Sequence, residues 1–314
     1  MARFVQYTQL GGPEVLEVVD GEAPHAGPGE VVVAVKAAGV NPIDAKLRSG
    51  ARPSAPIEAP RVPGTDAAGI ISEVGADVAG WQVGDEVIVA GAKGAYASDT
   101  VVAESGLTRK PGALSWAQAA GVGIPAATAY QALRSLGVGA GTTVLVHAAS
   151  GAVGQAALQF ARELGATVIG TASPANHDRI RQLGGTPVAY GPGLADRVRA
   201  VAPNGVDRVL DGAGTDEAIE ASLELVDDPA KVGTIVRGAD APRWGIRAWS
   251  GGSAVPLTPE EKAWRAEGVR RAAELAAEGR FDVEIARTLP LDQAVEAHRL
   301  IEDGGHRGKI VLLP

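Results

Sequence analysis

Cysteine is absent from the 314 residues of this chain. Its absence excludes disulfide bonds, thiolate nucleophiles and every zinc site that uses a cysteine ligand. The 5 histidines show no i, i+4 pair or other spacing of metal ligands; they are His25, His147, His177, His298 and His306. We therefore expect packing or surface histidines and no metal site.

Long apolar runs are also missing. A membrane-spanning helix needs about 18 or more consecutive apolar residues, and no such stretch occurs. The formal net charge of −8 lacks the basic character of a nucleic-acid-binding chain. The first residues, Met1–Val5, have the pattern of a strand rather than of a signal peptide. We expect no membrane or nucleic-acid partner, with the cytoplasm as the default location.

A turn of small residues follows an apolar run near the middle of the chain. Val144–His147 has the pattern of a buried strand, and Ala149–Gly154 has the spacing G-x-G-x-x-G with alanine in the first place. Ala149 permits a tight turn, Gly151 lets backbone N–H groups reach a pyrophosphate, and Gly154 lets the next helix pack on the strand. This context predicts a dinucleotide site; the alternative is a packing turn without a ligand. The expected phosphate contacts are Ser150, Gly151, Ala152 and Val153.

The end of the next predicted strand favours NADPH. An NAD site usually has an acidic residue there for the ribose 2′-OH. Here the chain reads Gly170-Thr171-Ala172-Ser173 instead, with no carboxylate to repel a 2′-phosphate. Ser173 and Asn176 can donate hydrogen bonds, and Arg179 supplies positive charge. In the alternative interpretation Ser173 caps the next helix and Arg179 is a surface charge.

The pattern of apolar and turn residues changes at about residue 121. Earlier residues form short alternating runs bounded by glycine and proline, which predict an antiparallel, barrel-like domain. Its clearest strands are Val31–Val35, Ala68–Val74 and Glu86–Val89. Later residues alternate between strand and helix patterns, which predicts a doubly wound parallel α/β sheet. The predicted strands are Val144–His147, Thr167–Thr171, Pro187–Tyr190, Val206–Asp211 and Val232–Arg237, with helices at Leu194–Val201 and Glu217–Leu225.

The tail is too short to fold as a separate domain. It has a predicted helix at Pro259–Glu278, a strand at Val283–Leu289, a helix at Leu291–Glu302 and a strand at Lys309–Leu313. We expect it to return to the first domain. The predicted domains are residues 1–120 with 257–314, and residues 121–256.

Several spaced motifs resemble one family. They are Gly39–Gly50, Val62–Gly69, Gly84–Val87, Thr128–Leu133, the turn Ala149–Gly154 and Gly308–Leu312. In this order the chain resembles the zinc-independent, ζ-crystallin-like quinone oxidoreductases of the medium-chain dehydrogenase/reductase superfamily. The resemblance implies a GroES-like catalytic domain interrupted by a Rossmann cofactor domain. It also implies a homodimer that pairs cofactor sheets, here near Trp244–Trp249.

The resemblance implies chemistry without zinc. Pro63–Asp66 stands where the zinc enzymes have a Gly-His-Glu type sequence. Transfer of a hydride from NADPH to a quinone or to an α,β-unsaturated carbonyl is compatible with the absence of zinc. The resemblance places Asn41 beside nicotinamide and substrate, where its amide could stabilise an oxyanion. Lys46 stands where quinone reductases often have tyrosine and could polarise a carbonyl; alternatively, it is a surface lysine. Asp44 is a cap or a partner for Lys46.

Further cofactor contacts follow from the resemblance and from the ends of predicted strands. Thr128 is the implied carboxamide contact and Tyr190 lies near the adenosine phosphate. Gly212 and Ala213 follow one strand, and Arg237 follows the next. In the alternative interpretation, Thr128 is an ordinary hydroxyl on a helix, Tyr190 is an aromatic residue at the edge of the core, and the residues after the two strands form ordinary turns. Arg237 could instead bind an acidic substrate.

The sequence therefore predicts an NADPH-dependent, metal-free quinone or enone reductase. The alternatives are an enoyl-thioester reductase, a tailoring enzyme of secondary metabolism, and a non-catalytic NADPH-binding sensor. The segment 239–258 departs most from the family pattern.

Overall fold

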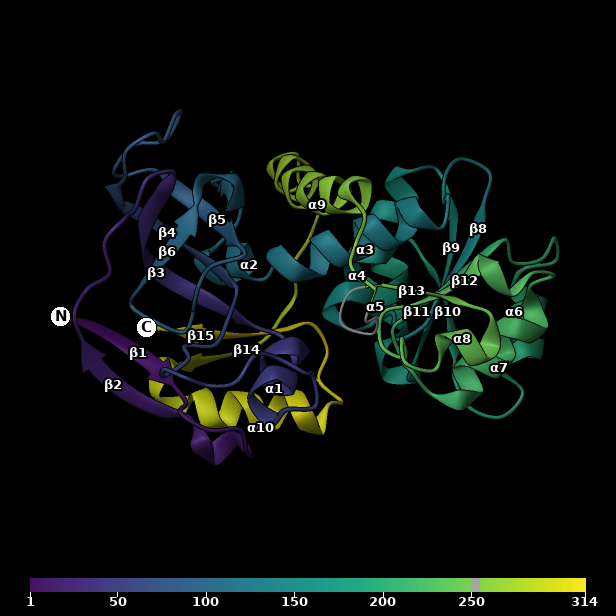
Figure 1. Ribbon diagram of the computed structural model, residues 1–314. Coiled ribbons are helices and arrows are strands. Elements are labelled where there is room, and N and C mark those ends of the chain that lie inside the picture. The colour runs from purple at the N-terminus through teal and green to yellow at the C-terminus, as the bar shows by residue number, and fades with distance from the viewer. Residues whose placement is uncertain (250–254) are drawn as a thin grey trace. The chain divides into compact units, whose positions relative to one another are not determined.

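The computed structural model describes residues 1–249 and 255–314, so part of the segment 239–258 lies outside the described residues. The chain forms two compact units (Figure 1). Unit 1 comprises Met1–Ile124 and Val269–Pro314, and unit 2 comprises Pro125–Gly268. These limits fall in α3 and α9, and the domain boundaries expected at 120/121 and 256/257 stay a prediction. Within the described ranges, no helix has the length and apolar character of a membrane span.

Unit 1 is rich in strands. They are β1 Ala2–Gln6, β2 Glu17–Gly21, β3 Glu30–Val40, β4 Asp66–Val74, β5 Glu86–Ala90, β6 Asp99–Ala103, β7 Leu107–Arg109, β14 Ile285–Pro290 and β15 Lys309–Leu313. Its helices are α1 Pro42–Ser49, α2 Trp116–Ala120 and α10 Ala294–Asp303, with 3-10 turns η1 Pro13–Val15, η2 Glu104–Gly106 and η6 Leu291–Gln293.

The main sheet of unit 1 joins both ends of the chain. Its order is β14-β15-β3-β4-β5-β7, with β6 also paired to β3. All its pairs are antiparallel except β14 with β15. Gly39 of β3 pairs with Asp66 of β4 and with Val311 of β15, so the residues that follow β3 lie beside the first residues of two other strands.

The core of unit 1 takes side chains from both segments. Val5, Ile71 and Val89 pack in one buried cluster with Leu289 and Leu312. Burial of these apolar side chains is what attaches the tail to the first part of the chain.

Unit 2 alternates strands and helices. Its strands are β8 Thr143–Val146, β9 Thr167–Ala172, β10 Thr186–Ala189, β11 Arg208–Asp211, β12 Val232–Thr234 and β13 Arg247–Ala248. Its helices are α4 Ala152–Glu163, α5 His177–Gln182, α6 Leu194–Val201, α7 Asp216–Leu225 and α8 Ala241–Trp244, with 3-10 turns η3 Pro174–Asn176 and η4 Pro229–Lys231. Two helices extend past its limits, α3 Gly123–Ser135 and α9 Pro259–Ala277.

The sheet of unit 2 confirms the doubly wound parallel prediction. Its order is β10-β9-β8-β11-β12-β13, and every pair is parallel. Numbered from β8, this is the order 3-2-1-4-5-6 of a dinucleotide-binding fold. Helices flank the sheet (Figure 1), and Leu145, Ile169 and Val209 lie in its buried core. The strand order reverses between β8 and β11, where such folds bind ligands beyond the carboxyl ends.

Some predicted boundaries were wrong. The strand predicted to end at Tyr190 ends at Ala189, and Tyr190 is 61% exposed. The strand predicted over Val232–Arg237 ends at Thr234, because the Thr234 hydroxyl accepts bonds from the next turn at Val236 N and Arg237 N. The sequence reading also missed α1. The edge strand β13 lies within Trp244–Trp249, where an edge was expected.

Candidate cofactor and active site

The turn between β8 and α4 is tightly packed at Gly154 and open at Gly151. A Cβ built on Gly154 would lie 2.3 Å from the Ala148 carbonyl oxygen, so a side chain there would push the helix off the strand. A Cβ on Gly151 would meet only that same oxygen, at 3.4 Å. Gly151 is the N-cap of α4, whose first backbone N–H groups are free of partners within the helix. The turn therefore leaves room where N–H groups can bind a phosphate.

Alanine in the first place of this turn is accommodated by a glycine on β9. Ala149 is fully buried, and a Cβ built on Gly170 would lie 2.7 Å from the Ala149 Cβ. Any larger residue at 170 would collide with it. The sequence alone indicated only that residue 170 is not acidic. A glycine inside a strand is the signal of close approach that could have revealed this contact.

The structure brings the three residues expected at the 2′-phosphate, Ser173, Asn176 and Arg179, together with Ser150 of the cofactor turn. Asn176 Nδ2 donates to Ser150 Oγ at 3.3 Å and to Ser173 Oγ at 3.2 Å. Arg179 Nε donates to Gln155 Oε1 at 2.9 Å, and Gln155 Nε2 donates to the Ser150 carbonyl oxygen at 2.9 Å. Gln155 was missed by the sequence reading. Within the described residues, these four hydrogen bonds join serine, asparagine, glutamine and arginine groups, which are suited to binding an anion.

Ser173 is not a side-chain cap. It occupies the N-cap of η3, but its hydroxyl accepts no backbone N–H there. The hydroxyl accepts from the side chain of Asn176 instead. The capping alternative for Ser173 was therefore wrong, and the hydroxyl lies within the polar cluster.

Buried Asp211 shapes the two loops after β11 and β12. Its Oδ1 accepts from Ala213 N at 3.0 Å and from Gly214 N at 2.9 Å, and its Oδ2 accepts from Thr234 Oγ1 at 2.7 Å. The Ala213 N–H is thus used inside the protein. Gly212, half-buried beside it, remains a predicted cofactor contact.

Arg237 binds acidic neighbours. Its Nε donates to Asp240 at 2.6 Å and its Nη1 donates to Asp216 at 3.0 Å. Its guanidinium carbon also lies 5.0 Å from the centre of the Trp244 ring. The hydrogen bonds to Asp240 and then Asp216 raise the pKa of Arg237. Its charge is compensated within unit 2, which weighs against a role for Arg237 with an acidic substrate.

His147 ends the strand run as a packing residue. Its Nδ1 lies 3.0 Å from Thr171 Oγ1, and its Nε2 lies 3.0 Å from Ser222 Oγ. Ser222 uses its proton on the Ala218 carbonyl oxygen, so Nε2 donates to Ser222 and Nδ1 accepts from Thr171. Burial lowers the pKa of His147 to about 4, against the opposing charge of Asp211.

Two predicted contacts of unit 2 lie in different environments. Thr128 is buried in α3, and its hydroxyl accepts from Arg265 Nη1 at 3.1 Å. Tyr190 is on the surface after β10. Their roles toward a cofactor remain predictions.

In unit 1, Asn41 is held between a cation and a carboxylate. Asn41 Nδ2 donates to Asp66 Oδ2 at 3.0 Å, and its Oδ1 accepts from Lys309 Nζ. A lysine ammonium can only donate and an ionised carboxylate can only accept, so the amide oxygen must face Lys309 and the amide nitrogen must face Asp66. The second Nδ2 hydrogen faces the Gly39 carbonyl oxygen at 3.3 Å. Asn41 is therefore an oriented, buried group whose donors already have partners.

Asp44 and Tyr96 extend this group. Asp44 Oδ2 accepts from Asn41 N at 2.9 Å, which caps α1, and from the Tyr96 hydroxyl at 3.0 Å. The capping expectation for Asp44 is confirmed. Burial raises the pKa of Asp44 to about 7, and burial followed by the charge of Asp44 raises the pKa of Tyr96. The sequence reading missed Tyr96.

Lys46 is half-buried on α1. Among residues 1–249 and 255–314, no hydrogen-bond or ion-pair partner is found for its ammonium, so Asp44 is not its partner. Its charge can meet a ligand without first breaking a salt bridge.

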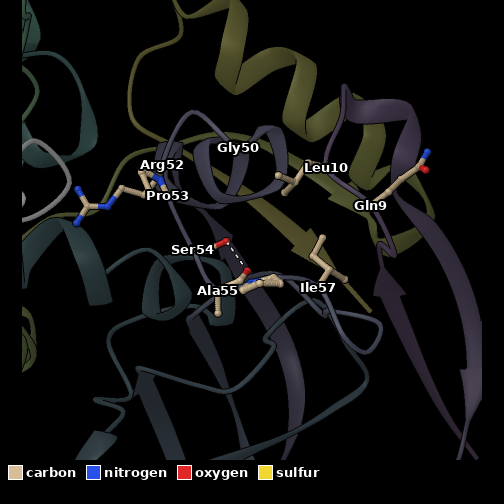
Figure 2. A pocket seen from close by; sticks show the side chains of 9 residues that line it. Gln9, Leu10, Gly50, Arg52, Pro53, Ser54, Ala55 and Ile57 are labelled. Atoms are coloured by element: carbon tan, nitrogen blue, oxygen red, sulfur yellow. Dashed lines mark hydrogen bonds between the residues drawn. The ribbon is translucent and has the colours of Figure 1, made fainter.

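The loop after α1 lines an open recess of about 520 Å³. Figure 2 shows Leu10 and Ile57 toward one end of the recess and Arg52 toward the other. Arg61 anchors this loop through Ser54 Oγ at 2.9 Å and the Pro56 carbonyl oxygen at 2.8 Å. The volume lies in the range of about 300–1,000 Å³ typical of small-molecule sites.

Three other histidines lie apart from one another in the structure. His25 pairs with Glu73, His177 faces the Ala172 carbonyl, and His298 packs edge-on against Tyr96. Within the described residues, no three His, Asp or Glu side chains are grouped as metal ligands.

Family models match both parts of the chain. The alcohol dehydrogenase GroES-like domain matches residues 27–133, and the zinc-binding dehydrogenase model matches residues 183–312. The human quinone oxidoreductase is 32% identical over 329 aligned residues, which cover 100% of this chain and 98% of that protein. The chain belongs to this family. It is a member of the zinc-independent quinone oxidoreductase branch of the medium-chain dehydrogenase/reductase superfamily.

Solved structures agree with this membership. The Escherichia coli quinone oxidoreductase complexed with NADPH has a TM-score of 0.84 and 28% identity, covering 99% of this chain and 100% of that one. The fold is the GroES-like domain with a parallel-sheet Rossmann domain. A spectinabilin polyketide synthase system protein of Streptomyces orinoci is 40% identical over 228 residues, covering 69% of this chain and 10% of that protein.

Proposed function

We propose that this oxidoreductase uses NADPH to reduce a quinone or an α,β-unsaturated carbonyl without a metal. The observation that supports NADPH as the cofactor is one polar cluster, which offers hydrogen-bond donors and positive charge to a 2′-phosphate. Its members are Ser150, Ser173, Asn176 and Arg179. The open cradle at Gly151 fits the pyrophosphate. The similar Escherichia coli structure holds NADPH.

Bound NADPH supplies the hydride, and the residues of the chain supply binding and charge. The α4 N-terminus and Gly151 hold the phosphates. Lys46 polarises the acceptor carbonyl, and Asn41 forms part of the wall beside it, oriented by Lys309 and Asp66. The recess beside the loop after α1 receives apolar parts of the acceptor. Thr128, Tyr190, Gly212, Ala213 and Arg237 border the cofactor, of which Arg237 acts through its loop rather than through free charge.

A nicotinamide absorbance assay tests the function. We expect an ortho-quinone and a small enone to oxidise NADPH, with NADH weaker and chelator without effect. Arg179→Gln should lower the preference for NADPH over NADH by about tenfold, which corresponds to about 1.4 kcal/mol. Arg181→Gln is the matched control, since Arg181 lies on the same helix and pairs with exposed Asp178. NADPH binding without turnover on any acceptor would favour the sensor role, and equal NADH and NADPH affinities would reject the cofactor assignment.

An enoyl-thioester reductase is the second candidate. The similarity to part of a polyketide synthase protein favours it. Faster NADPH oxidation with an enoyl thioester than with simple quinones would select it, or a tailoring role, over quinone reduction.

The exposed edge of β13 is proposed to pair with a second copy of the chain. Sedimentation analysis should then give twice the chain mass, and a charged residue at Ala248 should shift it toward monomer. We propose the cytoplasm as the location.

A further inference from the structure

One place in the interior of unit 1 holds more acidic than basic groups. Asp44, Asp66 and Lys309 are 3%, 0% and 3% exposed, respectively. Lys309 Nζ lies 3.7 Å from Asp66 Oδ2, which also accepts from Ile124 N at 2.9 Å. Two carboxylates and one ammonium leave one negative charge uncompensated when all three are ionised. An uncompensated charge in a dry interior is costly, so the cluster favours binding one proton.

Asp44 is the group that takes this proton. Asp66 is the carboxylate nearer to the Lys309 ammonium, whereas the donors to Asp44 among the described residues are neutral, Asn41 N–H and Tyr96 O–H. Burial raises the pKa of Asp44 to about 7; the Asn41 bond opposes this shift, the charge of Asp66 adds to it, and Lys309 and the Tyr96 bond oppose it. Asp44 is therefore poised between its two protonation states near neutral pH.

The other titratable groups around the cluster do not remove the excess charge. From α10, the His298 ring packs edge-on against Tyr96, and burial lowers the pKa of His298 to about 4, so it is neutral at pH 7. On α1, Arg48 is paired with Glu302, and Lys46 is half-buried at the surface. β4 contributes Asp66, β15 contributes Lys309 and the loop before β6 contributes Tyr96. His306, which precedes β15, interacts with the charge of Lys309, and burial lowers the pKa of His306.

Reduction of a quinone or an enone needs a proton as well as a hydride. We propose that the Asp44 carboxyl supplies this proton, with Tyr96, Asp66 and Lys309 as positioning residues; the inference rests on the proposed function. The hydride of reduced nicotinamide converts the acceptor to an anion, the hydroquinone monoanion or an enolate. The Asp44 O–H bond then breaks and a bond from hydrogen to that anion forms. The Asp44 carboxylate takes its proton back from solvent before the next turnover.

The discriminating variant is Asp44→Asn, which keeps an oxygen to accept from Asn41 and Tyr96 but cannot hold a transferable proton. In the wild type we expect kcat with a quinone or an enone to fall as pH rises through about 7. In Asp44→Asn we expect kcat at least about tenfold lower and that fall removed, with NADPH affinity unchanged. Asp99→Asn, in the same unit but outside the cluster, should keep both the rate and the pH profile. Lys46→Met should lower kcat while the fall near pH 7 remains.

A second readout does not depend on turnover. Infrared difference spectra of the wild type between pH 6 and pH 8 should show loss of a protonated carboxyl band, and Asp44→Asn should lack that band. A purely structural role predicts lower stability with an unchanged pH profile, and this result overturns the inference. The absence of the band at pH 6 in a wild-type enzyme that turns over normally overturns it as well, while the proposed function stands. Absence of turnover with every acceptor rejects the proposed function, whatever the infrared result.

Discussion

The polar clusters of the two units are built in opposite ways. The unit 1 cluster of Asn41, Asp44, Asp66, Tyr96 and Lys309 is buried, ionisable and joined by hydrogen bonds within itself. The unit 2 cluster around Ser150 and Asn176 is half-buried and rests on a backbone of small residues. A site that only binds an anion can use backbone N–H groups and partly hydrated donors. A site that holds a proton needs charges removed from water, at a cost in stability.

The largest effect should follow from breaking the charge balance in unit 1. Lys309→Met leaves two buried carboxylates without their cation, and we expect a loss of about 3–5 kcal/mol in the free energy of unfolding at pH 8. Denaturant unfolding measures it. Lys93→Met, which breaks the exposed pair with Glu30, should change stability by less than about 1 kcal/mol. Equal losses of unfolding free energy in the two variants would show that the buried carboxylates do not depend on the charge of Lys309.

A smaller effect separates the two glycines of the unit 2 turn. Gly154→Ala places a methyl group 2.3 Å from the Ala148 carbonyl oxygen, and we expect about 1–3 kcal/mol of destabilisation from overpacking. Gly151→Ala has room for its methyl group, so stability should hold while NADPH affinity falls, because the methyl occupies the phosphate cradle. Thermal unfolding and NADPH titration measure the two properties. The assignment of separate roles fails if both variants lose stability equally.

These differences also explain what the sequence could predict. The closeness of the unit 2 residues was predictable because they are near one another in sequence: the turn Ala149–Gly154, then Ser173, Asn176 and Arg179 just after the next strand. Local spacing, strand–helix alternation and the missing acidic residue carried the cofactor prediction. The Ala149–Gly170 contact was missed because it depends on how β9 passes the turn, which spacing alone does not describe.

The unit 1 cluster was not predictable in the same way. Asn41 and Asp44 belong to one motif, but Asp66 and Lys309 reach them through the register of β3 with β4 and β15. Tyr96 comes from a loop that had no pattern to mark it. The sequence reading assigned the oxyanion donor to Asn41, yet its amide hydrogens already face Asp66 and Gly39. Long-range strand register is what a single sequence leaves open.

The smallest effects should distinguish two buried histidines, one in each unit. His147 in unit 2 has both ring nitrogens bonded, whereas neither ring nitrogen of His298 in unit 1 has a hydrogen-bond partner among the described residues. At pH 7, His147→Leu should cost about 1 kcal/mol because Thr171 loses its acceptor, and His298→Leu should be close to neutral. Urea unfolding curves measure both.

Both histidines should also make the protein sensitive to acid. Burial lowers each pKa from 6.5 to about 4, so the unfolded chain binds a proton in this range that the folded chain does not. Stability therefore falls as pH falls from 6.5 toward 4, by up to about 1.4 kcal/mol per pH unit for each histidine. Asp44 acts in the opposite direction, because its raised pKa lets the folded state bind a proton between pH 4 and about 7. Each leucine variant should lower by one the number of protons taken up on unfolding between pH 4 and 6.5, so stability should depend less on pH. Asp44→Asn should make stability fall more steeply as the pH falls. If His298→Leu leaves the slope unchanged, the ring has the same pKa in the folded and the unfolded chain, and its partial positive charge near pH 6.5 would have to be added to the charge balance inferred for the unit 1 cluster.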